Sequence, residues 1–129
     1  MVVDSSALLA ILLDEPDRRR FTEAIEADPR RFVSAATLLE SAIVIEALRG
    51  EAAGRELDLL IHRASIACVP VDAEQVQIAR AAWRRYGKGR HPANLNFGDC
   101  FSYALAAASG EALLYRGDDF ARTDIAPAA

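Results

Sequence analysis

The chain has 129 residues, of which 52% are hydrophobic and 26% charged, a composition typical of a globular domain and not of a disordered protein. No apolar run approaches the roughly 20 residues that a membrane-spanning helix needs, and Asp4 interrupts the N-terminus too early for a signal peptide. The formal net charge of −4 argues against a generic polyanion binder, and we expect a cytoplasmic protein with no membrane partner.

Short apolar runs alternate with helical patterns along the first half of the chain. Ser5 or Ser6 is the expected cap of the first helix, and Gly50 is the expected end of the third. The expected elements are a strand at 1–4, a helix at 7–13, a helix from 16 to about 28, a strand at 31–33 and a helix at 34–49.

The second half repeats this alternation. Asp72 and Asn96 are the expected caps of two further helices, and a loop rich in glycine separates these helices. The expected elements are a helix at 54–64, a strand at 68–71, a helix at 72–86, a loop at 87–95, a helix at 96–109, a strand at 112–115 and a turn at 117–119.

Strands that alternate with helices predict an α/β domain with a mainly parallel central sheet of about four to five strands flanked by helices. The chain shows no interdomain linker, repeat or low-complexity segment, so we expect a single domain over residues 1–129. In sheets of this kind, ligands bind at the carboxyl ends of the strands. The acidic residues at those ends are therefore of interest.

Two predicted strands are followed directly by acidic residues. Asp4 ends the first strand, and Asp118 and Asp119 follow the strand at 112–115. Each of these acids, taken alone, is explained by turn formation or helix capping. If the two strands are parallel neighbours, however, their trailing carboxylates meet at one edge of the sheet.

Two further acids lie in helices. Glu40 belongs to SAATLLESAIVIEAL, which is apolar on nearly every side, as a buried helix is. A carboxylate in that setting needs a partner, and a salt bridge to an arginine is the alternative to a functional role. Asp99 lies in the first turn of the helix that Asn96 caps, where a carboxylate stabilises the helix dipole by roughly 0.3–1 kcal/mol.

It would be electrostatically costly to bring these acids together: Asp4, Glu40, Asp99 and either Asp118 or Asp119. Two carboxylates about 4 Å apart repel by about 4 kcal/mol at an effective dielectric of 20. The sequence places no lysine near any of these acids. A divalent cation would remove the repulsion, and oxygen ligands favour Mg²⁺, with Mn²⁺ as an alternative.

Residues 84–91, RRYGKGRH, contain four formal positive charges and no acid, and directly precede the Asp99 helix. They form either a solvated surface loop or a phosphate-binding segment, and Tyr86 or Phe97 either stacks on a base or packs in the core. The candidate RNA-binding residues are Arg84, Arg85, Lys88 and Arg90.

The two cysteines, Cys68 and Cys100, lie in apolar surroundings and far apart. Neither belongs to a CxxC pair, and neither histidine stands at zinc-ligand spacing from them. We expect both to be small buried hydrophobic residues.

Four ordered acidic motifs, VVDSSALLAILLDEP, SAATLLESAIVIEA, LNFGDCFSYALA and LLYRGDDFARTDIA, resemble PIN-domain proteins over essentially the whole chain. They resemble most closely the VapC toxins of bacterial type II VapBC toxin–antitoxin pairs. This resemblance implies a PIN fold and a Mg²⁺-dependent endoribonuclease that inhibits translation and growth. It also implies a homodimer and a cognate VapB antitoxin, whose tail blocks the acidic groove in a heterotetramer or a larger assembly.

By the same resemblance, Asp4 and Asp99 correspond to the principal metal ligands, and Glu40 corresponds to the third acid. Ser6 corresponds to the hydroxyl residue that supports the first aspartate. The resemblance thus implies a metal site formed by Asp4, Asp99 and Glu40, with Asp4 and Asp99 as principal ligands. It also implies that Glu40 and a fourth acid orient the attacking water.

The fourth acid departs from the family pattern. Many PIN domains carry a TxDxxF-like motif, and alignment on Phe120 puts Gly117 where that aspartate would stand. We therefore choose Asp119 as the fourth catalytic acid, with Asp118 as a supporting residue.

Two other functions fit parts of the pattern. A phospho-accepting receiver domain is also a small α/β protein, but it normally shows adjacent acids after its first strand and a lysine near its last. Here Ser5 and Ser6 follow Asp4, and Tyr115-Arg116 ends the last strand. A non-catalytic PIN-like scaffold that binds RNA or protein is the second alternative, and the four intact acidic motifs argue against it.

Overall fold

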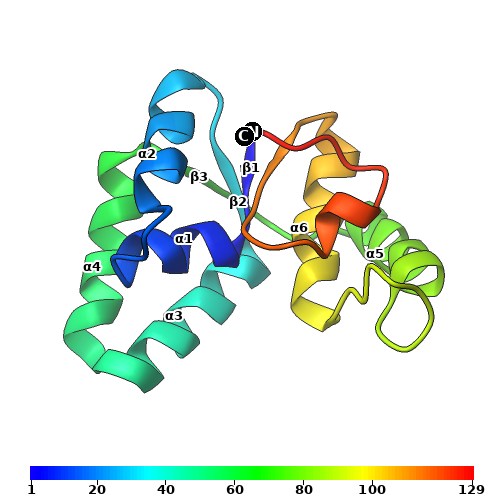
Figure 1. Cartoon of the computed structure of the whole chain (residues 1–129), viewed down its shortest axis with the longest axis horizontal. Helices are drawn as coiled ribbons and strands as arrows, with labels where there is room; N and C mark the ends of the chain where they lie inside the picture. The colour runs from blue at the N-terminus through cyan, green and yellow to red at the C-terminus, as the bar shows by residue number, and fades with distance from the viewer.

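The central sheet consists of four short strands, all parallel, in the order β3-β2-β1-β4 (Figure 1). The computed structural model describes residues 1–129. Val2 pairs with Phe32 on one side and with Leu113 on the other, which makes β1 a central strand. The predicted α/β class with a parallel central sheet is therefore confirmed. The strands are β1 (Val2–Val3), β2 (Phe32–Ser34), β3 (Ala67–Val69) and β4 (Leu113–Leu114).

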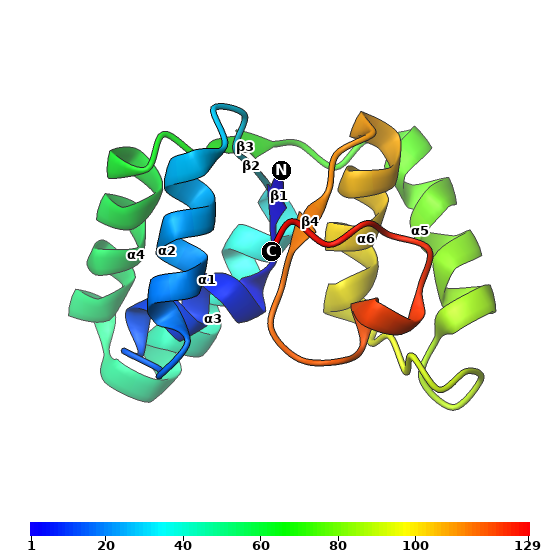
Figure 2. The ribbon, with the colours of Figure 1, turned by 45° about the horizontal axis from the view of Figure 1, so that its top comes forward.

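Helices cover both faces of this sheet. Figures 1 and 2 show α1 to α4 on one side and α5 and α6 on the other. The helices are α1 (Ser5–Leu12), α2 (Arg18–Ala27), α3 (Ala35–Arg49), α4 (Glu51–Arg63), α5 (Ala73–Tyr86) and α6 (Phe97–Ser109), and a short 3-10 turn follows at Phe120–Arg122.

The two faces of the sheet bury separate hydrophobic clusters, because successive side chains of a strand point to opposite faces. Val3 and Leu114 pack with α1 to α4, whereas Val2 and Leu113 pack with α5 and α6. All four side chains are 0–1% exposed. The strands are thus buried on both sides, as parallel strands generally are.

Helix boundaries follow the capping residues. Asp72 and Asn96 cap α5 and α6 as predicted, but α1 is capped by Asp4, whose carboxylate accepts from the Ser6 N–H, and not by a serine. The fourth helix begins at Glu51 instead of residue 54. Gly54 lies within the helix, and its missing side chain leaves room for Glu46 of α3, whose Cδ would lie 2.8 Å from an added Cβ.

Two burial predictions are wrong. The helix α3 is not buried all round: Ile45 is 1% exposed, but Leu39 and Ile43 are 62% and 59% exposed. Cys68 is exposed, whereas Cys100 is buried as predicted. No helix of the structure has the length and apolarity to cross a membrane.

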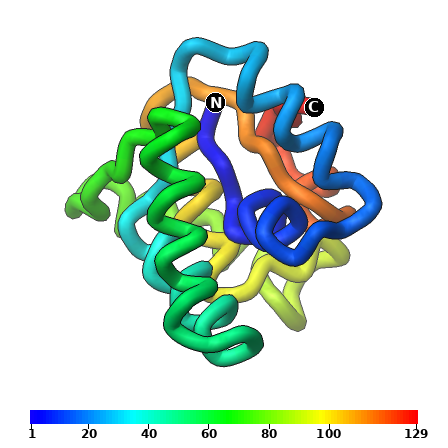
Figure 3. Tube along the Cα trace, turned by 90° about the vertical axis from the view of Figure 1, so that its left-hand side faces the viewer, coloured from blue at the N-terminus to red at the C-terminus, as the bar shows by residue number.

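The last residues return to the sheet. A backbone bridge joins Leu113 to Pro127, so both chain ends lie at the same end of the molecule (Figures 1 and 3). The opposite ends of β1 and β4, where their carboxyl termini lie, carry the acidic residues. That edge holds the candidate site.

Candidate active site

Asp4 lies at the carboxyl end of β1, and its side chain is only 2% exposed. Its Oδ2 accepts from the backbone N–H and the hydroxyl of Ser6, at 3.1 and 2.7 Å, while its Oδ1 accepts from the Ser102 hydroxyl at 2.5 Å. The Ser6 hydroxyl in turn accepts from the backbone N–H of Arg116, at 2.9 Å. The predicted supporting contact of Ser6 is thus present, and it joins Asp4 to the segment that follows β4.

Asp99 lies in the first turn of α6, as predicted. Its Oδ2 accepts from the Asn96 N–H at 3.0 Å, and the Asn96 Oδ1 accepts from the Asp99 N–H at 2.9 Å, which completes a capping box. Burial raises the pKa of Asp99 to about 7, against the opposing effect of the Asn96 N–H. The charges of Asp4, Asp119 and Glu40 make smaller contributions to this rise. Three acids from distant parts of the chain therefore act on Asp99.

Glu40 of α3 lies against the first turn of α6. A Cβ placed on Gly98 would overlap the Glu40 carboxylate, with only 2.7 Å to its Cδ. The absence of a side chain at residue 98 therefore creates the space that Glu40 occupies. The ion pairs of the structure involve other acids, so the arginine partner considered for Glu40 is not observed.

Asp118 and Asp119 are both exposed in the turn after β4. The charge of Asp119 acts on Asp99. This favours Asp119 over Asp118 as the fourth acid of the site.

The acid set fits a hydrated divalent cation. No three aspartate, glutamate, histidine or cysteine side chains form a ready-made cage for an ion. Mg²⁺ retains several waters and is usually held through one or two carboxylates, so it does not need such a cage. The donors are all oxygens; Asp4 is buried, Glu40 and Asp99 are partly buried, and Asp119 is exposed.

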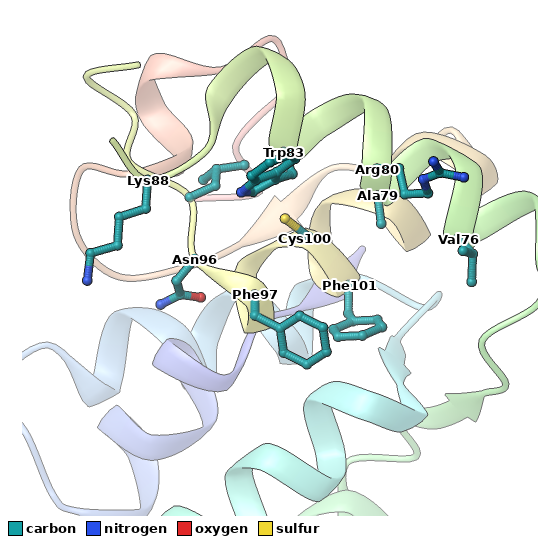
Figure 4. A pocket seen from close by; sticks show the side chains of 10 residues that line it. Val76, Ala79, Arg80, Trp83, Lys88, Asn96, Phe97, Cys100 and Phe101 are labelled. Carbon is teal, nitrogen blue, oxygen red and sulfur yellow. The ribbon is translucent and has the colours of Figure 1, made fainter. Parts of the chain in front are cut away.

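The four candidate basic residues occupy the end of α5 and the following loop, and all are exposed. Lys88 lines a groove of about 460 Å³ between α5 and α6, together with Asn96 and Phe97 (Figure 4). Arg90 places its guanidinium 4.2 Å from the centre of the Trp83 ring, which also lines that groove. The remaining two residues, Arg84 and Arg85, do not line it.

The two candidate aromatic residues differ. Tyr86 is 4% exposed and packs in the core, whereas Phe97 is 80% exposed. Phe97 stands edge-to-face with Phe101, with 4.9 Å between the ring centres, beside the acid-bearing turn (Figure 4). Core packing is therefore the wrong prediction for Phe97.

Sequence reasoning missed two residues beside Asp4. Ser102 and Thr37 are 0% and 1% exposed, and their hydroxyl oxygens lie 3.1 Å apart. A possible signal was their spacing, because each stands three residues from an acid of the site on its own helix.

Comparison with known proteins places this geometry in a family. The family model of the PIN domain matches residues 1–126. Ribonuclease VapC30 of Mycobacterium tuberculosis is 60% identical over 129 residues, which is 100% of this chain and 98% of the relative.

Two solved structures share the fold. The crystal structure of Mycobacterium tuberculosis VapC20, described as a Sarcin-Ricin loop cleaving toxin, superposes with a TM-score of 0.78 at 16% identity, over 96% of this chain and 95% of that one. A toxin–antitoxin complex from Klebsiella pneumoniae superposes with a TM-score of 0.68 at 20% identity, over 95% and 92%. The chain belongs to the PIN-domain family and, within it, to the VapC ribonucleases.

Proposed function

We propose that this protein is a Mg²⁺-dependent endoribonuclease toxin of a type II toxin–antitoxin pair, active in the cytoplasm, where it cleaves RNA and thereby inhibits translation and growth. The observation that supports the proposal is geometric: Asp4 is hydrogen-bonded to Ser102, one helical turn from Asp99, and Glu40 lies against Gly98, next to Asp99. The charges of Asp4, Asp119 and Glu40 also contribute to the raised pKa of Asp99. Acids placed in this way favour a bound cation or a proton, and a catalytic divalent ion is the cation we propose.

The residues of the site have different roles in hydrolysis. Asp4 and Asp99 would hold the cation, which when bound supplies charge neutralisation and polarises the scissile phosphodiester. Glu40 and Asp119 orient the attacking water and accept its proton. The water oxygen then forms the new bond to phosphorus as the bond to the leaving ribose oxygen breaks, and the leaving oxygen takes a proton from solvent water to become a hydroxyl. Fixed orientation of the water and the phosphate lowers the entropic part of the barrier.

The exposed basic residues support an RNA substrate. Lys88 lines the groove between α5 and α6, and Arg90 lies over the ring of Trp83, which also lines it, so both would contact phosphates next to the scissile one. Arg84 and Arg85 lie outside the groove and would contact more distant phosphates.

A cognate VapB antitoxin is the proposed protein partner. The support is membership of the VapC ribonucleases and the fold shared with the toxin–antitoxin complex from Klebsiella pneumoniae. An antitoxin tail that covers the acids would exclude RNA and stop cleavage. The proposed complex is a heterotetramer or a larger assembly.

A homodimer is the proposed state of the toxin. An apolar groove of about 320 Å³ lies between α3 and α6, beside Phe97 and apart from the groove that Lys88 lines. Exposed apolar patches of several hundred Å² generally mark interaction sites. The apolar side of α4 offers no such surface at Leu57, Leu60 and Ile61, because Leu57 is 0% exposed and the other two pack on the core.

The test is cleavage of single-stranded RNA by purified protein, with Mg²⁺ or with EDTA, in wild type and Asp99→Asn. We expect cleavage by wild type with Mg²⁺ alone, and a loss of at least about 100-fold in Asp99→Asn, because removal of a metal ligand or its support costs about 10- to 100-fold or more. Circular dichroism checks that the variant is folded. Equal cleavage by the two proteins would overturn the mechanism, and RNA binding without cleavage would favour the scaffold alternative.

A further inference from the structure

Two buried hydroxyl groups connect Asp4 to the helices that carry the other acids. The Ser102 hydroxyl of α6 lies 2.5 Å from Asp4 Oδ1, and the Thr37 hydroxyl of α3 lies 3.1 Å from the Ser102 hydroxyl. Both side chains are inaccessible to solvent, at 0% and 1% exposure. No water therefore reaches this contact from the surface.

The chemistry of the groups fixes the direction of the two hydrogen bonds. An ionised carboxylate only accepts, and a hydroxyl carries a single donor proton. Ser102 therefore donates its proton to Asp4 Oδ1, and Thr37 donates to the Ser102 oxygen. Consecutive hydrogen bonds polarise each other, so the bond from Thr37 strengthens the Ser102 hydroxyl as a donor to Asp4.

The positions of Thr37 and Ser102 on their helices show why these two hydrogen bonds matter. Thr37 stands three residues before Glu40 on α3, and Ser102 stands three residues after Asp99 on α6. Residues three apart are neighbours on one face of a helix. Each acid-bearing helix is thus attached to Asp4 through a hydroxyl one turn from its own acid.

We propose that Thr37 and Ser102 are positioning residues that set the relative placement of Asp4, Glu40 and Asp99 for a divalent cation. This inference rests on the proposed metal-dependent function. This pair of hydrogen bonds, from Thr37 to Ser102 and from Ser102 to Asp4, is called the relay below. The relay opposes the mutual repulsion of the acids while the metal is absent, and it holds the Asp4 carboxylate in one orientation. Ser6 fixes Oδ2 in the same way from the opposite side.

Direct measurement of metal binding tests this inference without relying on cleavage. Mn²⁺ is the probe, and its Kd is measured by calorimetry in wild type, Ser102→Ala and Thr37→Val. Ser102→Ala removes a hydrogen bond to the ligand itself, so we expect a Kd raised about 10- to 100-fold. Thr37→Val keeps the shape and touches no acid, so we expect a smaller rise of about 2- to 10-fold.

Two matched variants separate positioning from general stability. Thr37→Ser keeps the donor hydroxyl and should retain the wild-type Kd. Ser41→Ala removes another buried hydroxyl of α3, which donates to the Thr37 carbonyl oxygen at 2.8 Å and lies outside the relay. We expect Ser41→Ala to leave the Kd unchanged even where it lowers the melting temperature.

The outcomes distinguish failure of the relay from failure of the proposed nuclease function. Wild-type Kd values in both Ser102→Ala and Thr37→Val would overturn the relay while leaving the proposed nuclease intact. If the Kd for Mn²⁺ rose as much in Ser41→Ala as in Thr37→Val, the relay would also be overturned, because the effect would then come from core packing. A wild-type protein that binds no Mn²⁺ would overturn the proposed function and the relay together.

Discussion

Asp99 has two opposed effects on the stability of the fold. Its carboxylate completes the capping box with Asn96, which stabilises the start of α6. The same carboxylate is buried among Asp4, Asp119 and Glu40, which disfavours its charged form. Capping alone needs no raised pKa, so the raised value marks the residue as more than a helix cap.

The first prediction concerns the pH dependence of stability in EDTA. The pKa of Asp99 rises from 3.8 to about 7 on folding, so the folded state keeps a proton that the unfolded state releases between these values. The free energy of unfolding should therefore fall as pH rises from about 4 to 7, and stay low above that. The full effect is about 4 kcal/mol, which we reduce to about 1–2 kcal/mol because Asp99 is partly exposed.

Urea unfolding at pH 5 and pH 8 measures this effect. Asp99→Asn removes the titrating group, so its stability should exceed that of wild type at pH 8 and approach it at pH 4. Asp58→Asn, which neutralises an exposed acid of α4, is the matched control and should follow the wild-type curve. Parallel pH curves for wild type and Asp99→Asn would contradict the burial of charge at this site.

A second prediction separates stability from activity at Gly98. Alanine is favoured over glycine in a helix by about 1 kcal/mol, so Gly98→Ala should leave the melting temperature unchanged or raise it. The new Cβ would, however, displace the Glu40 carboxylate, which is the flexible end of its side chain. We expect a loss of RNA cleavage of about 10-fold or more, because a misplaced water-orienting group costs that much.

Gly54→Ala is the matched control for this displacement. Its Cβ would meet the flexible carboxylate of Glu46 in the same way, at 2.8 Å from the Cδ, but far from the site. We expect it to resemble Gly98→Ala in melting temperature and wild type in cleavage. Loss of cleavage in both variants would show that the effect belongs to helix packing and not to Glu40.

At the scale of elements, the predictability of each helix depended on how local its signals are. The α6 helix was predicted from Asn96 to Ser109 because its cap, its first turn and its terminal glycine are all encoded in adjacent residues. The burial of α3 was not predicted correctly. Leu39 and Ile43 are exposed, but in a sequence such residues look the same whether they pack in a core or lie on a surface. Hydrophobicity predicts that a face is covered, but not by what.

The loop between α5 and α6 gives a third prediction. Lys88 and Arg90 lie along the groove, and each phosphate contact contributes about 0.7 to the slope of log K against log salt for single strands. The double substitution of these two residues by alanine should weaken binding of a catalytically inactive protein to RNA and reduce that slope by up to about 1.4. Fluorescence anisotropy at 50 to 200 mM salt measures it.

Substitution of Arg84 and Arg85 by alanine removes the same charge from the end of α5, outside the groove. It should reduce the slope less than the loss of Lys88 and Arg90 does. If the two double variants were equivalent, the effect would be one of net charge and the groove would have no special part in RNA binding.

At the scale of the whole molecule, the parallel sheet explains why a site could be predicted before its geometry was known. Parallel neighbours bring their carboxyl ends to one edge, so Asp4 and the turn after β4 had to meet once β1 and β4 were paired. The relay of Thr37 and Ser102 could not be predicted in this way. Serine and threonine are common in helices, and only the packing of α3 against α6 shows that their hydroxyls are buried and face Asp4.

The final prediction concerns the apolar surface that the folded monomer leaves uncovered. Leu39 and Ile43 line the groove between α3 and α6, beside the exposed ring of Phe97. A surface with a projecting ring beside an apolar groove can pair with itself about a two-fold axis, since each copy offers both the ring and the groove. We therefore expect wild type to sediment as a dimer of twice 14.0 kDa.

Replacement of Leu39 and Ile43 by glutamate would place two charges in a desolvated contact, so we expect the dimer Kd to rise about 30-fold or more. Sedimentation velocity over a range of concentrations measures this change. Leu59→Glu on α4, where the leucine is 47% exposed but lines neither groove, is the control and should remain dimeric. A wild-type monomer at high concentration would contradict the homodimer. A dimer that survives in the double variant would instead place the contact elsewhere, and the apolar grooves of α3, α5 and α6 would then be free for the antitoxin.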